Sequence, residues 1–357
     1  MKLTPESTRL RRIMGSILFC VMIVAEFTYA GMVLRPSGSG AVGGAAWIAF
    51  EELEPDTADV VFFGSSHAFT AVDPAVLWRQ RGIPAFVHAG PTQMLEVTEY
   101  YMRETLKTQR PRVIALEMAS SSYSTRTFRP NFHAMNVGLM PWSENKLAAS
   151  WFATPPDMRV NILLDVWAYH GRWSELTSAD FALGDKDDQA TYLMGFNPNT
   201  RTEVVESATY IRPESDYPIA NAGIAHNRET LRRIAQLCED NDIELLLFLA
   251  PTGPPESLTY YMMSAAEDLQ QRYRNVAVLD LSSPGAVPDL SYETDFRDGG
   301  HLNWRGAEKV SRVLADFMTD TYDLSDRRSS AAHAAWSDAA AKRDEHIARI
   351  SGESVAE

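Results

Sequence analysis

The stretch Asp59–His67, which reads DVVFFGSSH, decides the fold. The apolar segment Asp59–Phe63 predicts a strand that is buried on both faces, as in parallel sheets covered by helices. Gly64 then allows the backbone to turn into a helix, and Ser66 lies at that turn. Because ligands of α/β proteins bind at the carboxyl edge of the sheet, Ser66 is a candidate nucleophile.

Further apolar segments alternate with helical periodicities along the chain. The expected strands after the first are 85–88, 112–117, 243–250 and 276–281, and the expected helices are 74–81, 94–108, 227–241, 255–273 and 303–322. Continuous apolar strands that alternate with helices indicate a parallel sheet covered on both faces. We therefore expect a three-layer, doubly wound α/β fold of the flavodoxin-like type.

The composition narrows the class of protein. The chain has 357 residues, of which 45% are hydrophobic and 22% charged, as in a globular protein with one large domain and appendages. A formal net charge of -14 argues against a nucleic-acid partner. Cys20 and Cys238 lie too far apart to suggest a disulfide, and no Cys/His cluster indicates a metal. We expect neither a metal nor a cofactor.

Residues 13–34 predict a transmembrane helix. Basic side chains precede the span and acidic ones follow it, so the positive-inside rule leaves residues 1–12 in the cytoplasm and exports the rest. The chain is thus expected to be a single-pass protein of the inner membrane with a periplasmic or extracellular domain. A cleaved signal peptide ending at Thr28–Ala30 is the alternative, and it exports the same domain.

The remaining boundaries follow from composition. Residues 35–50 are rich in glycine and predict a flexible linker, and 51–325 form the α/β domain. A block at about 120–224, rich in Trp, Tyr, His and Pro, exceeds an ordinary loop and predicts an insertion that shapes the substrate site. The Ala-rich residues 326–357 predict a mobile helical tail.

A second motif, Asp298-Gly-Gly-His301, precedes the last expected helix. The Asp298 carboxylate can reach Nδ1 of His301 across the Gly-Gly turn, which leaves Nε2 to act as a general base. Each motif alone has an ordinary explanation, since Ser66 can cap its helix and Asp298 or Asn303 can cap the last one. Both motifs together, in this order, predict a catalytic triad of Ser66, His301 and Asp298.

The two motifs resemble those of the SGNH hydrolase superfamily. The run 64–67 (GSSH) resembles the GDS block of the nucleophile, and Asp298-x-x-His301 resembles the block of the acid and base. The resemblance covers most of residues 59–323. The strings FFGSSH, RDGGHLNWRGAEKV and AYHGRWSEL are similar to membrane-anchored proteins of envelope acylation, including those of teichoic-acid D-alanylation and alginate O-acetylation. This resemblance implies an SGNH-like fold and a polytopic membrane-bound O-acyltransferase as partner.

The sequence departs from the family pattern at two places. Ser65 stands where GDS enzymes have Asp, and no Gly-x-Asn block follows the third expected strand. The side-chain donor to the oxyanion is therefore unassigned. Gly90 resembles the glycine of the second block, so its N–H and that of Ser66 are the expected backbone donors. Gln93 is either a substitute side-chain donor or a surface residue at a helix start.

Four other side chains are candidates for substrate contact. His67 follows the nucleophile and either touches substrate or supports the helix. His170, Arg172 and Trp173 combine a titratable ring, a cation and an aromatic plane suited to a sugar. Alternatively, Trp173 anchors the insertion to the core.

Glu26 lies inside the expected span, where a carboxylate costs about 2.5 to 3.5 kcal/mol on insertion scales. It either faces lipid in its neutral form or pairs with a partner's helix. Glu117, at the end of the third expected strand, either lines the site or caps a turn.

These features predict an extracytoplasmic serine esterase or O-acyltransferase. The enzyme would move a small acyl group, acetyl by expectation, to or from an envelope polysaccharide through an ester of Ser66. The direction stays open, because either water or a sugar hydroxyl can attack the acyl-enzyme. The alternative is a non-catalytic SGNH-like scaffold that recruits the polysaccharide or the O-acyltransferase, which the missing third block favours.

Overall fold

A five-stranded parallel sheet forms the centre of the protein, in the order β2-β1-β3-β4-β5. The computed structural model describes residues 5–34, 44–123, 127–163, 166, 169–181, 191–205, 222–253 and 259–352. The strands are β1 (Val60–Gly64), β2 (Ala85–Ala89), β3 (Val113–Glu117), β4 (Glu244–Leu249) and β5 (Val276–Asp280). This order is the flavodoxin-like one, so the expected α/β fold is confirmed, and the switch in strand order falls between β1 and β3.

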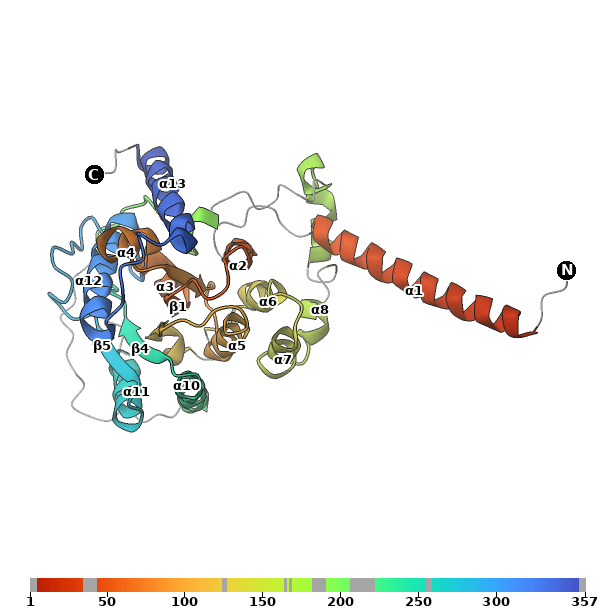
Figure 1. Ribbon diagram of the computed structural model, residues 1–357, viewed down its shortest axis with the longest axis horizontal. Coiled ribbons are helices and arrows are strands. Elements are labelled where there is room, and N and C mark those ends of the chain that lie inside the picture. The colour runs from red at the N-terminus through yellow and green to blue at the C-terminus, as the bar shows by residue number, and fades with distance from the viewer. Residues whose placement is uncertain are drawn as a thin grey trace.

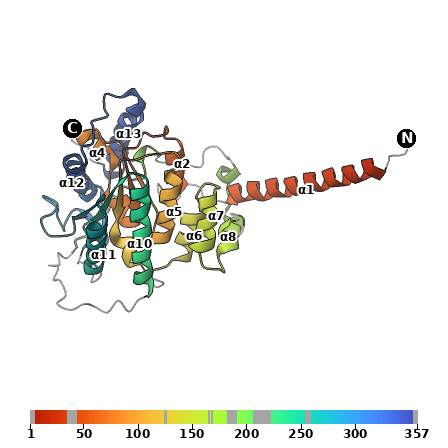
Figure 2. The same cartoon turned by 60° about the horizontal axis from the view of Figure 1, so that its bottom comes forward.

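Helices cover both faces of the sheet (Figures 1 and 2). Side chains of β1 alternate between two cores: Val61 and Phe63 face one, and Val60 and Phe62 face the other. The first core is covered by α5 (Leu95–Thr105), α10 (Ala222–Asp240) and α11 (Thr259–Arg272). The second is covered by α3 (Ser66–Ala71), α4 (Pro74–Arg81) and α12 (Trp304–Tyr322).

The N-terminal helix α1 (Pro5–Leu34) extends away from this body (Figure 1). Its segment Arg11–Leu34 is long and apolar enough to cross a membrane. A short helix, α2 (Gly44–Glu51), occupies the end of the range that composition predicted to be a flexible linker. The linker prediction is corrected there, because Trp47 and Phe50 are each only 3% exposed and pack in the first core.

The insertion contributes helices beside α5 (Figure 2). They are α6 (Pro130–Gly138), α7 (Glu144–Phe152) and α8 (Arg159–Leu163). Short 3₁₀ segments precede and follow them: η1 (Met118–Ser122), η2 (His170–Glu175), η3 (Ser178–Phe181) and η4 (Thr191–Leu193). Residues 182–190 and 206–221 of the expected insertion lie outside the described part of the chain.

The C-terminal tail forms a packed helix, α13 (Ala334–Ser351), and not the mobile one that composition predicted. It lies against α4, with Trp336 and Ile347 buried. Arg343 is fully buried and binds the Asp73 carboxylate through Nε at 2.6 Å and Nη2 at 2.5 Å. This charge pair inside the protein fixes the tail to the sheet domain.

Candidate active site

The candidate nucleophile lies in a tight turn between β1 and α3. Gly64 has φ 146°, and a Cβ there would come 3.0 Å from Cβ of Glu117 and 3.1 Å from that of Ala68, so the turn requires glycine. Ser65 directly precedes α3, makes no side-chain capping hydrogen bond to it, and is fully buried. Its hydroxyl oxygen accepts a hydrogen bond from the Tyr123 hydroxyl at 2.9 Å, and this contact holds the turn.

The other two triad candidates share a two-residue hairpin. Asp298 ends β6 (Phe296–Asp298) and faces His301, which opens β7 (His301–Leu302). Nδ1 of His301 lies 2.7 Å from Oδ1 of Asp298, and Nε2 lies 2.8 Å from Oγ of Ser66. The structure therefore joins the three predicted residues in one hydrogen-bonded chain. His301 belongs to a strand and not to the helix start, because Asn303 is the residue that caps α12.

The surroundings keep the imidazole neutral and the carboxylate charged. Burial lowers the pKa of His301, and the adjacent Asp298 offsets only part of this. Burial acts to raise the pKa of Asp298, but hydrogen bonds from His301 and from the Gly300 N–H, at 2.9 Å, outweigh it and leave the pKa below its usual range. A neutral imidazole with its Nδ1 proton held by a carboxylate can accept the Ser66 proton at Nε2.

A second group of side chains gathers where β2 ends. Gly64 pairs with Ala89 in neighbouring strands, which lie about 4.8 Å apart in such a sheet, and Gly90 is the next residue after Ala89. A Cβ at Gly90 would lie 2.1 Å from Oδ1 of Asn136 and 2.7 Å from Oε1 of Gln93, so glycine is what lets these two carboxamides approach. Gln93 is fully buried, with Nε2 donating to Thr98 at 2.9 Å, which excludes the surface alternative.

Asn136 is a candidate that sequence reasoning missed. It comes from α6 of the insertion, is fully buried, and donates through Nδ2 to the Pro91 carbonyl at 3.1 Å. No motif marks this residue, since the sequence pattern searched for an Asn directly after β3. Only the packing of α6 on the end of β2 brings a carboxamide to Gly90.

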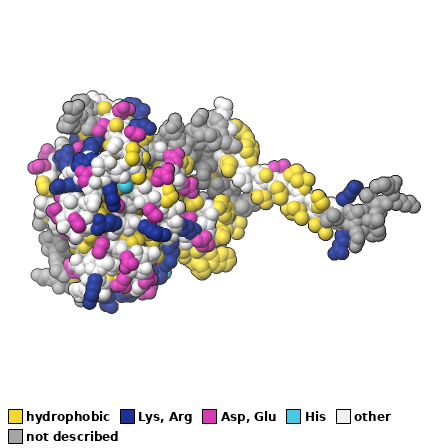
Figure 3. All heavy atoms as spheres, in the orientation of Figure 1, with side chains coloured by type: hydrophobic (Ala, Val, Ile, Leu, Met, Phe, Trp, Pro, Cys, Tyr) yellow, Lys and Arg dark blue, Asp and Glu magenta, His cyan; other side chains and the backbone are white. Residues whose placement is uncertain are grey.

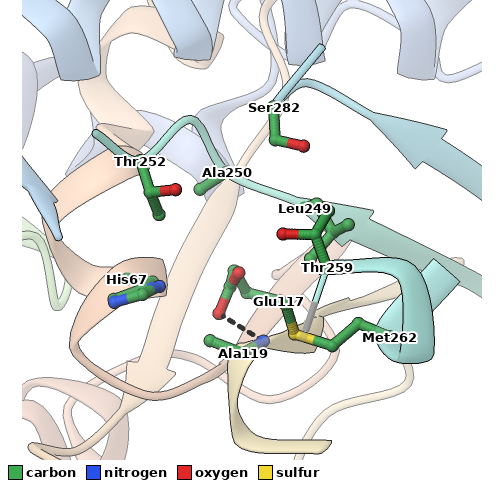
Figure 4. Close-up of a pocket in the computed structure, with 9 residues that line it drawn as sticks. All are labelled: His67, Glu117, Ala119, Leu249, Ala250, Thr252, Thr259, Met262 and Ser282. Atoms are coloured by element: carbon green, nitrogen blue, oxygen red, sulfur yellow. Dashed lines mark hydrogen bonds between the residues drawn. The ribbon is translucent and has the colours of Figure 1, made fainter. Parts of the chain in front are cut away.

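His67 lines a small cavity beside the triad (Figure 4). The cavity holds about 10 Å³, roughly room for one water molecule. The His67 ring lies edge-on to that of His301 with centroids 5.1 Å apart, and burial lowers its pKa to about 3, so the ring is neutral. Glu117 points toward the same cavity, and its carboxylate caps η1 by accepting from the Ala119 N–H at 3.1 Å. Glu117 therefore both lines this cavity and caps a turn, the two roles that the sequence left open.

The predicted sugar-contacting residues lie beside the end of α1. Arg172 donates from Nη1 to the Leu34 carbonyl at 2.6 Å and pairs with Asp180 of η3 at 3.2 Å. Trp173 is 61% exposed, which does not fit a role as a buried anchor, and His170 is exposed as well. The contacts described for Arg172 thus go to α1 and η3, and substrate contact by this group stays a prediction.

No protein-family model matches the sequence, and no curated protein matches it. Among solved structures, the chain is similar to a protein of Bacteroides fragilis NCTC 9343 described as an acylhydrolase. The two are 11% identical with a TM-score of 0.38, and the match covers 77% of this chain and 95% of that one. A similarity of this size says nothing about the reaction.

Proposed function

We propose that the protein is a membrane-anchored serine esterase or O-acyltransferase with Ser66, His301 and Asp298 as its catalytic triad. The observation that carries the proposal is the pair of contacts from Ser66 to His301, 2.8 Å, and from His301 to Asp298, 2.7 Å. Two distant parts of the chain supply these groups, so local helix capping does not explain their alignment. The triad lies at the carboxyl edge of the sheet, where α/β enzymes act.

The proposed reaction proceeds through an ester of Ser66. Nε2 of His301 removes the hydroxyl proton as Oγ of Ser66 bonds to the acyl carbonyl carbon, and Asp298 holds the imidazole tautomer. The same nitrogen then gives the proton to the departing oxygen, and the carbonyl re-forms as acyl-serine. Water or a sugar hydroxyl, deprotonated by His301, next attacks this ester and releases Ser66.

We assign the oxyanion site to the end of β2 and the start of α3. The backbone N–H groups of Ser66 and Gly90 are the proposed donors, since the first N–H groups of a helix have no acceptor within it. Asn136 and Gln93 lie next to Gly90 with their carboxamide oxygens toward it, while Nδ2 of Asn136 donates to the Pro91 carbonyl and Nε2 of Gln93 donates to Thr98. Asn136 is our candidate for the third-block amide, a role that requires its carboxamide to turn so that Nδ2 faces the oxyanion.

The proposed substrate is an acetylated or acetyl-accepting envelope polysaccharide on the outer side of the inner membrane. The support is the apolar α1, with Arg9, Arg11 and Arg12 before it, together with the resemblance of the site motifs to envelope acylation proteins. A polytopic membrane-bound O-acyltransferase is the proposed source of acyl groups. Glu26 is exposed on α1 and is a candidate contact for it.

A fluorophosphonate probe tests the catalytic proposal directly. We expect the probe to label wild-type protein at Ser66, and Ser66→Ala to abolish both labelling and hydrolysis of a soluble acetyl ester. Ser65→Ala is the matched control, because the neighbouring hydroxyl binds Tyr123 and not His301. Equal labelling of wild type and Ser66→Ala, or an unlabelled but folded wild type, would leave the scaffold as the better interpretation.

A further inference from the structure

Large hydrophobic side chains are exposed on one side of the globular body. Among the described residues outside α1, ten such side chains are exposed; nine of them lie in the insertion, and eight of these nine fall between residues 132 and 181. We call these eight the apolar face: Phe132, Trp142, Leu147, Trp151, Phe152, Val160, Trp173 and Phe181. Figure 3 shows hydrophobic side chains gathered on the side of the body next to α1. Contiguous exposed apolar surface of this kind marks an interaction site.

Helix α7 has the reverse of the polarity of a surface helix in water. Its inner side buries Lys146 and Ser150, which are 3% and 1% exposed, while Leu147 and Trp151 point outward at 51% and 59%. The Lys146 ammonium is held inside by the carbonyls of Gly138 and Met140 at 2.6 and 3.0 Å. An amphipathic helix normally turns its apolar side inward. The outer side of α7 therefore fits an apolar surrounding.

The apolar face lies beside the point where α1 joins the body. Gly31, Val33 and Leu34 are buried, whereas the preceding turns of α1 are exposed, so its last turn is packed into the protein. The segments η2 and η3 contact this end, and the Arg172 guanidinium binds the Leu34 carbonyl. The apolar segment Arg11–Leu34 has 24 residues. Its length of about 36 Å crosses a hydrocarbon core of about 30 Å, which leaves Leu34 at the bilayer surface.

We propose that the apolar face rests on the lipid bilayer, in the boundary between headgroups and acyl chains around the exit of α1. This inference depends on the proposed membrane anchor and goes beyond the proposed reaction. Tryptophan and phenylalanine next to basic side chains are typical of this boundary. The half-buried Arg159 stacks on the exposed Trp151, with its guanidinium carbon 4.7 Å from the ring centroid, which places a cation beside an indole of the apolar face.

Lipid fits better than a protein partner because α1 holds this face at the membrane whatever else is bound. The exposed side chains also come from several elements, from α6 to η3, as a broad contact with a bilayer requires. Contact at α1 and at the apolar face together fixes the height and tilt of the body. The triad then acts on acyl groups at a set distance from the bilayer.

Spin labels on the full chain in phosphatidylcholine vesicles test this docking. We would attach a nitroxide at Leu147→Cys or Val160→Cys in a Cys20→Ser background, with Val204→Cys, 73% exposed outside the apolar face, as the matched control. Cys238 does not compete for label, because burial raises the pKa of its thiol to about 12. Strong relaxation of a nitroxide by oxygen indicates that the label lies in lipid, and strong relaxation by a water-soluble nickel complex indicates that it is exposed to water.

We expect oxygen to relax the labels at 147 and 160 strongly, and nickel to relax them severalfold less than the label at 204. Nickel relaxation equal to that at 204 would show a water-exposed face and overturn the docking. Shielding from both agents would mean burial against protein, such as a polytopic partner or a second copy, and would overturn it too. Thermal melts and fluorophosphonate labelling, unchanged from wild type, confirm that the variants fold.

A nitroxide on the native Cys20 separates failure of the docking from failure of the anchor. Cys20 is exposed on α1 and should be reached by oxygen and shielded from nickel. If nickel reaches it, the anchor and the docking are both wrong. If the label at Cys20 is shielded from nickel and the label at position 147 is not, the anchor is right and only the docking is wrong. Fluorophosphonate labelling of Ser66 in the same vesicles reports on the proposed reaction independently.

Discussion

In the proposed reaction, the protonation state of His301 determines when Ser66 can attack. Since burial lowers the pKa of this imidazole below its ordinary 6.5, the base stays neutral to lower pH than a free histidine would. We expect kcat/KM for a soluble acetyl ester to rise with pH and to reach half its plateau below pH 6.5. Asp298→Asn should reduce kcat by about 10⁴-fold, because the tautomer is lost. A half-maximum above pH 6.5 would contradict the role assigned to His301.

The contact between Gly90 and Asn136 makes a second prediction at single residues. In Gly90→Ala the new Cβ would lie 2.1 Å from Oδ1 of Asn136, so the carboxamide and the oxyanion donors must shift. We expect kcat to fall by about 10²- to 10³-fold, as when one oxyanion donor is lost, with little change in KM. Gly138→Ala is the control, because its Cβ would meet only the Ile162 carbonyl at 3.7 Å. Similar losses in both variants would point to damage to α6 and not to the oxyanion site.

The residues of the candidate site differ in how far sequence alone could find them. Ser66, Asp298 and His301 could be found because each lies in a short motif at the end of a predictable strand or before a helix. Asn136 could not, because its position depends on how the insertion packs. The contact of Arg172 with the end of α1 could not be predicted for the same reason, because it too depends on how the insertion packs.

At the level of elements, the sheet was predictable because its strands are buried on both faces and therefore uniformly apolar. The helices α2 and α13 were not, because each is fixed by a few side chains in sequence that otherwise looks like linker or tail. Trp47 and Phe50 bury α2, and Trp336 with the Arg343–Asp73 pair holds α13. A few contacts of this kind leave no periodic hydrophobic pattern in the sequence from which the packing of these helices could be predicted.

The Arg343–Asp73 pair makes the prediction at this scale. Arg343→Met would leave the Asp73 carboxylate, 1% exposed, without its counter-charge, and we expect the free energy of unfolding to fall by about 3–5 kcal/mol. Arg328→Met, which breaks an exposed pair with Asp326, is the control and should cost at most about 1 kcal/mol. Urea unfolding of the full chain in detergent measures both. Equal stability of the two variants would mean that α13 does not depend on the buried pair.

For the whole molecule, we propose that α1 is a retained anchor and not a cleaved signal peptide. The helix runs without a break from Pro5 to Leu34, and Gly31 and Val33 are buried, so cutting after Ala30 would separate a continuous helix from the turn that packs against η2 and η3. The basic residues before the span should keep the N-terminus in the cytoplasm.

We therefore expect alkaline phosphatase, fused after residue 43, to be active because it lies outside the cytoplasm. The full chain should remain with membranes after a high-salt wash, since apolar insertion is not screened by salt. Mass spectrometry of the purified protein should find peptides from the region before Ala30. A mature chain that begins at Gly31 would defeat the anchor while leaving export intact, and an inactive fusion in intact cells would contradict export itself. The activity of the fusion reports the orientation of the chain, and the N-terminus of the mature protein reports whether the chain stays attached to the membrane. The docking of the apolar face depends on this attachment.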